Sequence, residues 1–154
     1  MAGTILLADD SPHARRMGSQ YLSDLGYAVV TAADGEAALA ALGQLAPELI
    51  LVDAALPGMP DAGSEGELGG MALCRRVKAE PAWRTIPVLV LVGALSQPTP
   101  GELAGADGVL RKPLSSAGLE SWLSRGRRRE AGAGEQLSRE AMLERAVREA
   151  ALGS

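Results

Sequence analysis

Four charged residues are the strongest candidates for chemistry, because each follows directly on a buried strand predicted from the sequence: Asp9, Asp10, Asp53 and Lys112. The carboxyl ends of parallel strands lie at one edge of a sheet, and open α/β sheets bind their ligands there. Three carboxylates that converge on one point repel each other and need a compensating charge. Mg2+ prefers oxygen ligands and suits such a site. The four residues therefore predict an acidic magnesium site with a lysine beside it.

These residue types meet the needs of phosphoryl transfer to a carboxylate. An aspartate oxygen is a weak nucleophile, but it attacks phosphorus when the phosphoryl charge is neutralised and the geometry is in line. A metal ion can screen one side of the phosphoryl group while a lysine contacts an oxygen on the other side. Three acids and one lysine are thus the minimum set for forming and hydrolysing an aspartyl phosphate.

The elements that must position these side chains follow from the hydrophobic pattern. Short apolar runs predict strands at residues 4–8, 27–32, 48–52, 86–92 and 108–111. Apolar residues at helical spacing, among them Met17, predict helices at residues 12–25, 35–45, 71–80 and 116–125, with a short helix near 100–104. Ser11 is the expected N-cap of the first helix. Strands that alternate with helices indicate an open, parallel α/β sheet with helices on both faces.

Further short stretches resemble the receiver domain of bacterial two-component response regulators. In the order of that family, the chain has LPGM at 56–59, AEPAWRTIPV at 79–88 and GADGVLRKPL at 105–114. The resemblance covers residues 3–125. It implies a flavodoxin-like, doubly wound sheet of five parallel strands in the order 2-1-3-4-5, with helices on both faces.

The resemblance also implies a role for each candidate residue. Asp53 would be the phosphoacceptor, and Lys112 would contact the phosphoryl group. Asp10 would bind Mg2+ directly, Asp9 would act mainly through water, and the backbone carbonyl of Ala55 would complete the protein ligands. The implied partner is a sensor histidine kinase or a phosphotransfer protein. Such domains are signalling proteins, so at most slow self-phosphorylation from small donors and self-dephosphorylation are expected.

Two positions depart from the family pattern. Receivers usually carry Thr or Ser at the end of the fourth strand, where the hydroxyl bonds the phosphoryl group, and this chain has Val92 there. An aromatic residue usually stands three positions before the lysine and moves with that hydroxyl, and this chain has Val109. The sequence therefore supports phosphorylation at Asp53 but not the usual way of transmitting it.

The chain divides into three parts by its patterning. Residues 1–125 form the receiver-like domain, with an insertion loop at about 58–70 that is a flexible segment, a lid or a partner contact. Residues 126–136 are linker-like, and residues 137–152 predict a C-terminal helix with a narrow apolar stripe. That helix can pack on the domain, pair with a second copy or dock on an output protein. A monomer or a weak homodimer is expected.

Composition excludes several classes of protein. Residues 1–113 carry 13 acids and 8 bases, and the chain has no Phe, which disfavours nucleic-acid binding. No stretch reaches the length of a membrane span, and no secretory signal is present, so a cytoplasmic location is expected. The single Cys74 is expected to serve packing rather than redox chemistry.

Three functional hypotheses follow. The first is a stand-alone receiver that accepts a phosphoryl group on Asp53 and signals through protein contacts. The second is a pseudo-receiver adaptor that acts without phosphorylation, which Val92 and Val109 favour. The third, an aspartyl-nucleophile phosphatase, is disfavoured because that class places its two aspartates two residues apart, whereas Asp9 and Asp10 are adjacent.

Overall fold

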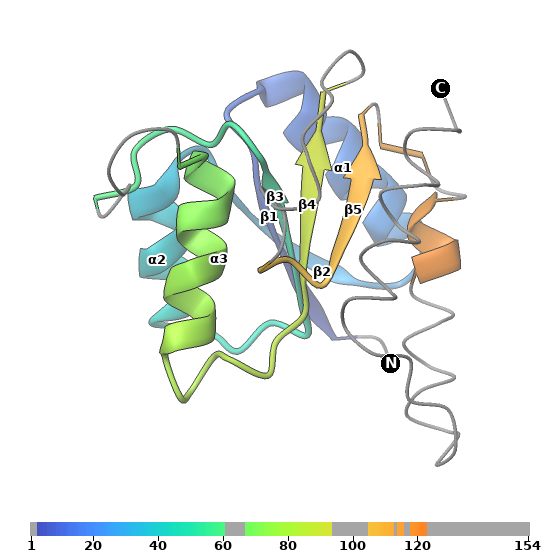
Figure 1. Ribbon diagram of the computed structural model, residues 1–154. Helices are drawn as coiled ribbons and strands as arrows, with labels where there is room; N and C mark the ends of the chain where they lie inside the picture. The colour runs from blue at the N-terminus through green and yellow to red at the C-terminus, as the bar shows by residue number, and fades with distance from the viewer. Residues whose placement is uncertain (1–2, 61–66, 94–104, 113, 116–117, 123–154) are drawn as a thin grey trace.

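A single parallel sheet forms the centre of the protein (Figure 1). The computed structural model describes residues 3–60, 67–93, 105–112, 114–115 and 118–122. Its five strands lie in the order β2-β1-β3-β4-β5, which confirms the expected order. The strands are β1 (Thr4–Ala8), β2 (Ala28–Ala32), β3 (Leu49–Asp53), β4 (Val88–Val92) and β5 (Gly108–Arg111).

Helices cover both faces of this sheet, as the alternating pattern predicted. α1 (Pro12–Asp24) lies on one face, while α2 (Gly35–Leu42) and α3 (Gly69–Ala79) lie together on the other (Figure 1). Residues 118–122 are also helical and pack on the face of α1 through Leu119 and Trp122. This agrees with the helix expected at 116–125 as far as that segment is described.

The local signals that start and end the first two helices are those expected from the sequence. The Ser11 hydroxyl accepts a hydrogen bond from Ala14 N at 3.2 Å, and Pro12 occupies the first turn of α1. Gly26 follows the helix with φ of 93°, a conformation that glycine adopts without strain. The Asp34 carboxylate caps α2 by accepting a hydrogen bond from Ala37 N at 2.8 Å.

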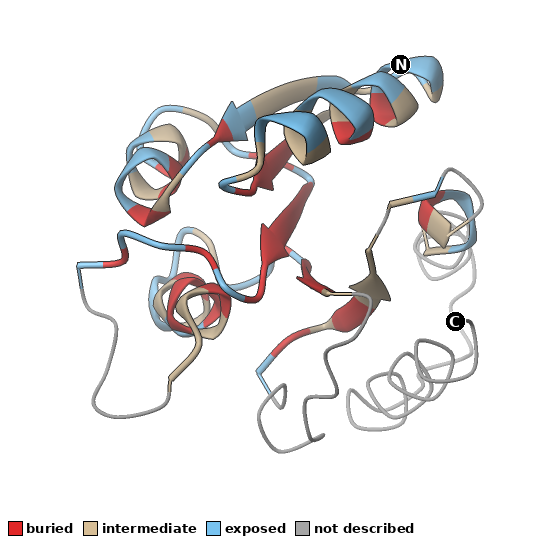
Figure 2. Cartoon of the chain, turned by 90° about the horizontal axis from the view of Figure 1, so that it is seen from above, coloured by how far each residue is buried: buried red, intermediate tan, exposed pale blue. Residues whose placement is uncertain are grey.

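Alternating strand residues divide the core into two apolar clusters. One set of buried strand residues packs under α2 and α3, and these are Leu6, Ala8, Ala32, Ile50, Val52, Val88, Val90, Val92 and Val109. The opposite set packs under α1, and these are Ile5, Leu7, Leu49, Leu51, Leu89 and Leu91. Seen from above, buried residues gather in the strands and on the inner sides of the helices (Figure 2). The three central strands are buried on both faces, as parallel strands between two helical layers must be.

A partly buried ion pair fixes the amino-terminal ends of β4 and β5 to α3. Lys78 Nζ lies 2.7 Å from Asp107 Oδ2 and donates a hydrogen bond to the carbonyl of Ile86 at 2.8 Å. Asp107 Oδ2 also accepts a hydrogen bond from Val88 N at 2.8 Å. This clamp lies at the sheet edge opposite to the acidic residues, so its role is structural.

The structure corrects several sequence-based expectations. Met17 is 39% exposed on α1 instead of packing inward, because the helix turns Gly18 toward Leu7 of the sheet. β3 ends on Asp53 rather than before it, β4 begins at Val88, and α3 begins two residues earlier than predicted. The helix expected near 100–104, residues 61–66 of the insertion, the linker and the C-terminal helix at 137–152 lie outside the described residues. Within the described part, no helix has the length and apolarity needed to span a membrane.

The central position of β3 leads to a stability prediction. Leu51 is fully buried between β1 and β4, so Leu51→Ala should lower the free energy of unfolding by about 2–5 kcal/mol, measured by urea denaturation. Met17→Ala, at the exposed position on α1, should change it by less than about 0.5 kcal/mol. Equal effects of the two changes would contradict this assignment of the core.

Candidate phosphoacceptor and metal site

The fold brings the predicted charged residues to one edge of the sheet. Asp9 and Asp10 follow β1, and Asp53 is the last residue of β3. β1 and β3 are neighbours, with Ala8 paired to Val52, so the acids lie side by side. One carboxylate oxygen from each of the three acids lies within 4.8 Å of the other two. The expected acidic cluster is therefore present.

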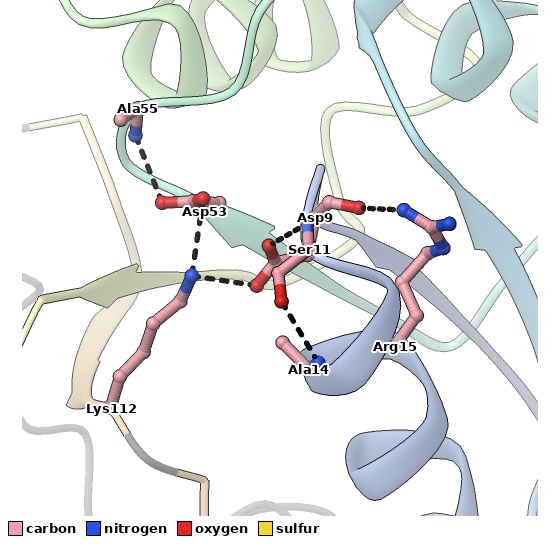
Figure 3. A network of polar contacts seen from close by, with 7 residues as sticks. All are labelled: Asp9, Ser11, Ala14, Arg15, Asp53, Ala55 and Lys112. Carbon is pink, nitrogen blue, oxygen red and sulfur yellow. Dashed lines mark hydrogen bonds and ion pairs between the residues drawn. The ribbon is translucent and has the colours of Figure 1, made fainter.

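Lys112 reaches the cluster from the far side of β4. Its backbone N donates a hydrogen bond to the carbonyl of Val92 at 2.8 Å, which extends the pairing of β5 with β4 by one residue. From there the side chain extends back over β4, and Nζ lies 3.1 Å from Asp53 Oδ2 and 2.8 Å from Asp9 Oδ2 (Figure 3). One ammonium group thus bridges two carboxylates from different strands.

The two carboxylates stabilise the protonated form of Lys112. Partial burial by itself lowers the pKa of Lys112, but the hydrogen bonds and negative charges of Asp9 and Asp53 outweigh burial and raise it above the ordinary value of 10.5. The folded chain therefore holds this proton more tightly than the unfolded chain. The resulting stabilisation is fully present below pH 10.5 and is lost as the pH rises through the higher pKa of the folded state.

Backbone groups hold the other oxygens of the two bridged carboxylates. Asp53 Oδ1 accepts a hydrogen bond from Ala55 N at 3.0 Å, and Asp9 Oδ1 accepts one from Ser11 N at 2.9 Å (Figure 3). Arg15 Nη1 donates to the backbone carbonyl of Asp9 at 2.7 Å, on the side away from Lys112. These contacts fix both carboxylates before any ligand arrives, which is how a preorganised site avoids the cost of ordering its groups.

The donor set fits a hard divalent cation. Asp9 is fully buried, and its Oδ2 is paired with the Lys112 ammonium at 2.8 Å. One ammonium offsets the charge of only one of the three clustered carboxylates, and a divalent cation would offset the rest. Asp10 is exposed and offers its oxygen from the solvent side. Asp9, Asp10 and Asp53 would hold Mg2+, with the exposed loop at Ala55 next to them.

Sequence patterns found the charged residues but missed one that supports them. Arg15 was not predicted to contact the site, and the signal that could have found it is its position one turn after the N-cap of α1, beside Asp9. Cys74 is buried, as expected for a packing residue, and its Sγ donates a hydrogen bond to the carbonyl of Gly105 at 3.0 Å. His13, in the first turn of α1, is exposed. Val92 and Val109 are buried in the cluster under α2 and α3. Neither position offers a hydroxyl or an aromatic ring.

Comparison with known proteins decides the family. The family model of the response regulator receiver domain matches residues 5–124. The chain belongs to this family. As a receiver domain, it is a component of two-component signalling, and its fold is that of the CheY-like response regulators. Receiver domains bind Mg2+ at an acidic pocket and interact with histidine kinases or phosphotransfer proteins; they are signalling proteins rather than typical enzymes.

Relatives of this receiver domain vary widely in length. Protein PilG of Pseudomonas aeruginosa is 32% identical over 117 residues, which span 75% of this chain and 80% of PilG. A probable transcriptional regulator ycf27 from Cyanophora paradoxa is 34% identical over 119 residues, or 76% of this chain and 45% of that protein. A gliding motility regulatory protein from Myxococcus xanthus is 38% identical over 111 residues, 70% of this chain but only 13% of its own length. The chain therefore spans less than half of the latter two relatives.

Solved structures share the receiver fold, and one of them contains a magnesium ion. The chemotaxis response regulator CheY4 of Vibrio cholerae superimposes with a TM-score of 0.67 at 28% identity, over 81% of this chain and 98% of CheY4. The receiver domain of the sensor histidine kinase PA1611 from Pseudomonas aeruginosa gives a TM-score of 0.68 at 29% identity, over 81% of this chain and 97% of that domain. That structure holds a magnesium ion coordinated in the active site cleft.

The bridge made by Lys112 leads to a prediction about metal affinity. Lys112 and a divalent cation compete for the same carboxylate oxygens, so Lys112→Met should tighten Mg2+ binding by about tenfold in titration calorimetry. Without Mg2+ the variant should lose about 1–3 kcal/mol of unfolding free energy, because two carboxylates lose their cationic partner.

Lys78→Met is the matched control, because it breaks a lysine–aspartate pair at the opposite edge of the sheet. It should lower stability and leave the Mg2+ dissociation constant unchanged. Weaker Mg2+ binding by Lys112→Met would show that the lysine supports the cation instead of competing with it.

Proposed function

We propose that this receiver domain accepts a phosphoryl group on Asp53 from a histidine kinase or a phosphotransfer protein. The proposal is supported by the way the two oxygens of the Asp53 carboxylate are held beside Asp9 and Asp10. Oδ1 accepts a hydrogen bond from Ala55 N, and Oδ2 accepts one from Lys112 Nζ. This arrangement surrounds one acid with a backbone donor, the Lys112 ammonium and two further acids that would bind the metal. It meets each requirement for forming an acyl phosphate.

The reaction follows from these contacts. An oxygen of the Asp53 carboxylate attacks the phosphorus of a phosphohistidine, the phosphorus–nitrogen bond breaks, and the imidazole leaves with the bonding electron pair and takes up a proton. Lys112 releases Asp9 and binds an oxygen of the incoming phosphoryl group, because that group carries more negative charge than one carboxylate. Asp9, Asp10, Asp53 and the Ala55 carbonyl would hold Mg2+, which would supply positive charge to offset that of the phosphoryl group.

Labelling with a small phosphodonor tests the proposal. With Mg2+ and acetyl phosphate or phosphoramidate, intact-mass spectrometry should detect one added phosphoryl group, and peptide mapping should place it on Asp53. Asp53→Asn should abolish the label, because an amide cannot form the acyl phosphate. Asp24→Asn, which changes an exposed acid on α1 outside the site, should be labelled like the wild type. A label that persists in Asp53→Asn would overturn the assignment.

A second function is favoured by Val92 and Val109, which lie buried in one apolar cluster. A receiver whose fourth and fifth strands carry no hydroxyl and no mobile ring at these places lacks the usual means of reporting the phosphoryl group. Such a domain would serve as a pseudo-receiver adaptor, acting through protein contacts that do not depend on phosphorylation. Its output partner, an action through the helix at 137–152, a stand-alone organisation and a cytoplasmic location stay predictions.

The two functions differ in what a phosphoryl mimic does to the fold. When Mg2+ and beryllofluoride are added, we expect the NMR signal of the Ala55 amide to shift strongly, because its hydrogen bond to Asp53 changes. The methyl signals of Val109 should shift little, since apolar packing offers the mimic nothing to bond. Comparable shifts at both positions would show that β5 relays the signal. No shift at either position, even at a high concentration of the mimic, would show that the site does not bind it and would favour the pseudo-receiver.

A further inference from the structure

The first turn of α3 rests directly on the backbone that follows Asp53. The residue before the helix, Leu68, makes no side-chain capping hydrogen bond, and the first turn contains no acidic residue. Backbone N–H groups at a helix start need partners from elsewhere. One is supplied by the phosphoacceptor loop, because Gly70 N donates a hydrogen bond to the carbonyl of Ala54 at 2.9 Å.

The absence of side chains at Gly69 and Gly70 permits this close approach. A Cβ atom at position 70 would overlap the carbonyl oxygen of Asp53 and lie 2.8 Å from Ala54 Cα. A Cβ atom at position 69 would overlap the carbonyl oxygen of Leu56 and lie 2.9 Å from its carbonyl carbon. Among the described glycines only Gly26 and Gly58 have positive φ, so space, rather than backbone conformation, requires glycine at 69 and 70.

A single peptide unit links the start of α3 to the Asp53 carboxylate. The Ala54–Ala55 peptide donates its N–H to Asp53 Oδ1 at 3.0 Å and accepts Gly70 N at its carbonyl. Peptide units are planar, so a shift of the carbonyl turns the N–H with it. The preceding amide, Ala54 N, is held separately by the carbonyl of Leu91 in β4 at 2.8 Å. The loop is therefore fixed by the sheet on one side and by α3 on the other.

We propose that Gly69 and Gly70 are positioning residues for the phosphoacceptor site. By admitting α3 to the backbone of residues 53–56, they fix the Ala54–Ala55 peptide, which orients the Asp53 carboxylate and places the Ala55 carbonyl for the metal. This rests on the proposed function, in which Asp53 and Ala55 serve Mg2+ and the phosphoryl group. A side chain at either position displaces the loop from the acidic cluster.

The test compares Gly70→Ala and Gly69→Ala with Gly43→Ala. At Gly43, which follows α2, an added Cβ would meet its nearest atoms at 3.5 Å and 3.7 Å, which is ordinary contact. Mg2+ dissociation constants are measured by calorimetry, labelling rates with phosphoramidate, and stability by urea denaturation. Gly70→Ala and Gly69→Ala should weaken Mg2+ binding about 10–100-fold, the usual effect of losing support around a metal site. Gly43→Ala should leave the constant within about twofold of the wild type.

The outcomes separate this inference from the proposed function. A wild-type chain that neither binds Mg2+ nor is labelled on Asp53 refutes the function itself. If the wild type does both, and the two variants keep its Mg2+ affinity while losing only stability, the positioning role is refuted.

If the variants do not fold, amide hydrogen exchange of the wild type decides. Mg2+ should slow exchange at Gly70 and Ala55 and leave Val77, near the other end of α3, unchanged. Equal rates at Gly70 with and without Mg2+ would refute the positioning role.

Discussion

Repulsion among three carboxylates at one sheet edge is the constraint on which the rest of this structure depends. Asp9 is fully buried, and Asp53 nearly so, yet both face the same small volume. The ammonium of Lys112 offsets part of this charge by bridging the two carboxylates. The bridge requires β1, β3 and β5 to end at one level, which the parallel register of the five strands provides. The apolar core thus serves to align strand ends.

The sheet is held differently at its two edges. At the amino-terminal ends of β4 and β5, the Lys78–Asp107 pair joins α3 to both strands through direct hydrogen bonds. At the carboxyl edge, Lys112 has two acidic partners, Asp9 and Asp53. A ligand shifts only those contacts whose energies differ between two states. In the proposed function Lys112 would exchange one partner for the phosphoryl group, while the Lys78–Asp107 pair would keep the other ends of the strands in place.

The sequence was sufficient to predict the features that depend on hydrophobic periodicity and on the residues that follow each strand. Alternation of strands and helices predicted the layers, and an acid or a lysine after each of three strands predicted the site. Contacts between separate elements of the fold leave no periodic pattern in the sequence, so the sequence did not predict them. Arg15 reaches Asp9 only because α1 folds back beside β1, and Met17 is exposed because Gly18 takes the inward position. The start of α3 at Gly69 was missed because glycines in a polar stretch are typical of a loop. In this protein the two glycines begin a helix, and they are needed because the helix contacts the backbone of residues 53–56.

The direct contact of α3 with the loop after Asp53 also determines where this protein tolerates changes of sequence and length. The insertion begins and ends in described residues, with Met59 packed against Gly35 of α2 and Glu67 bonded to Arg75 of α3. Gly69 and Gly70 anchor the helix after that insertion, and the sheet anchors the strand before it. Changing the length of a surface loop costs little when both of its ends are fixed independently. The chain between Met59 and Glu67 can therefore change in sequence and length without altering the geometry of the acidic cluster.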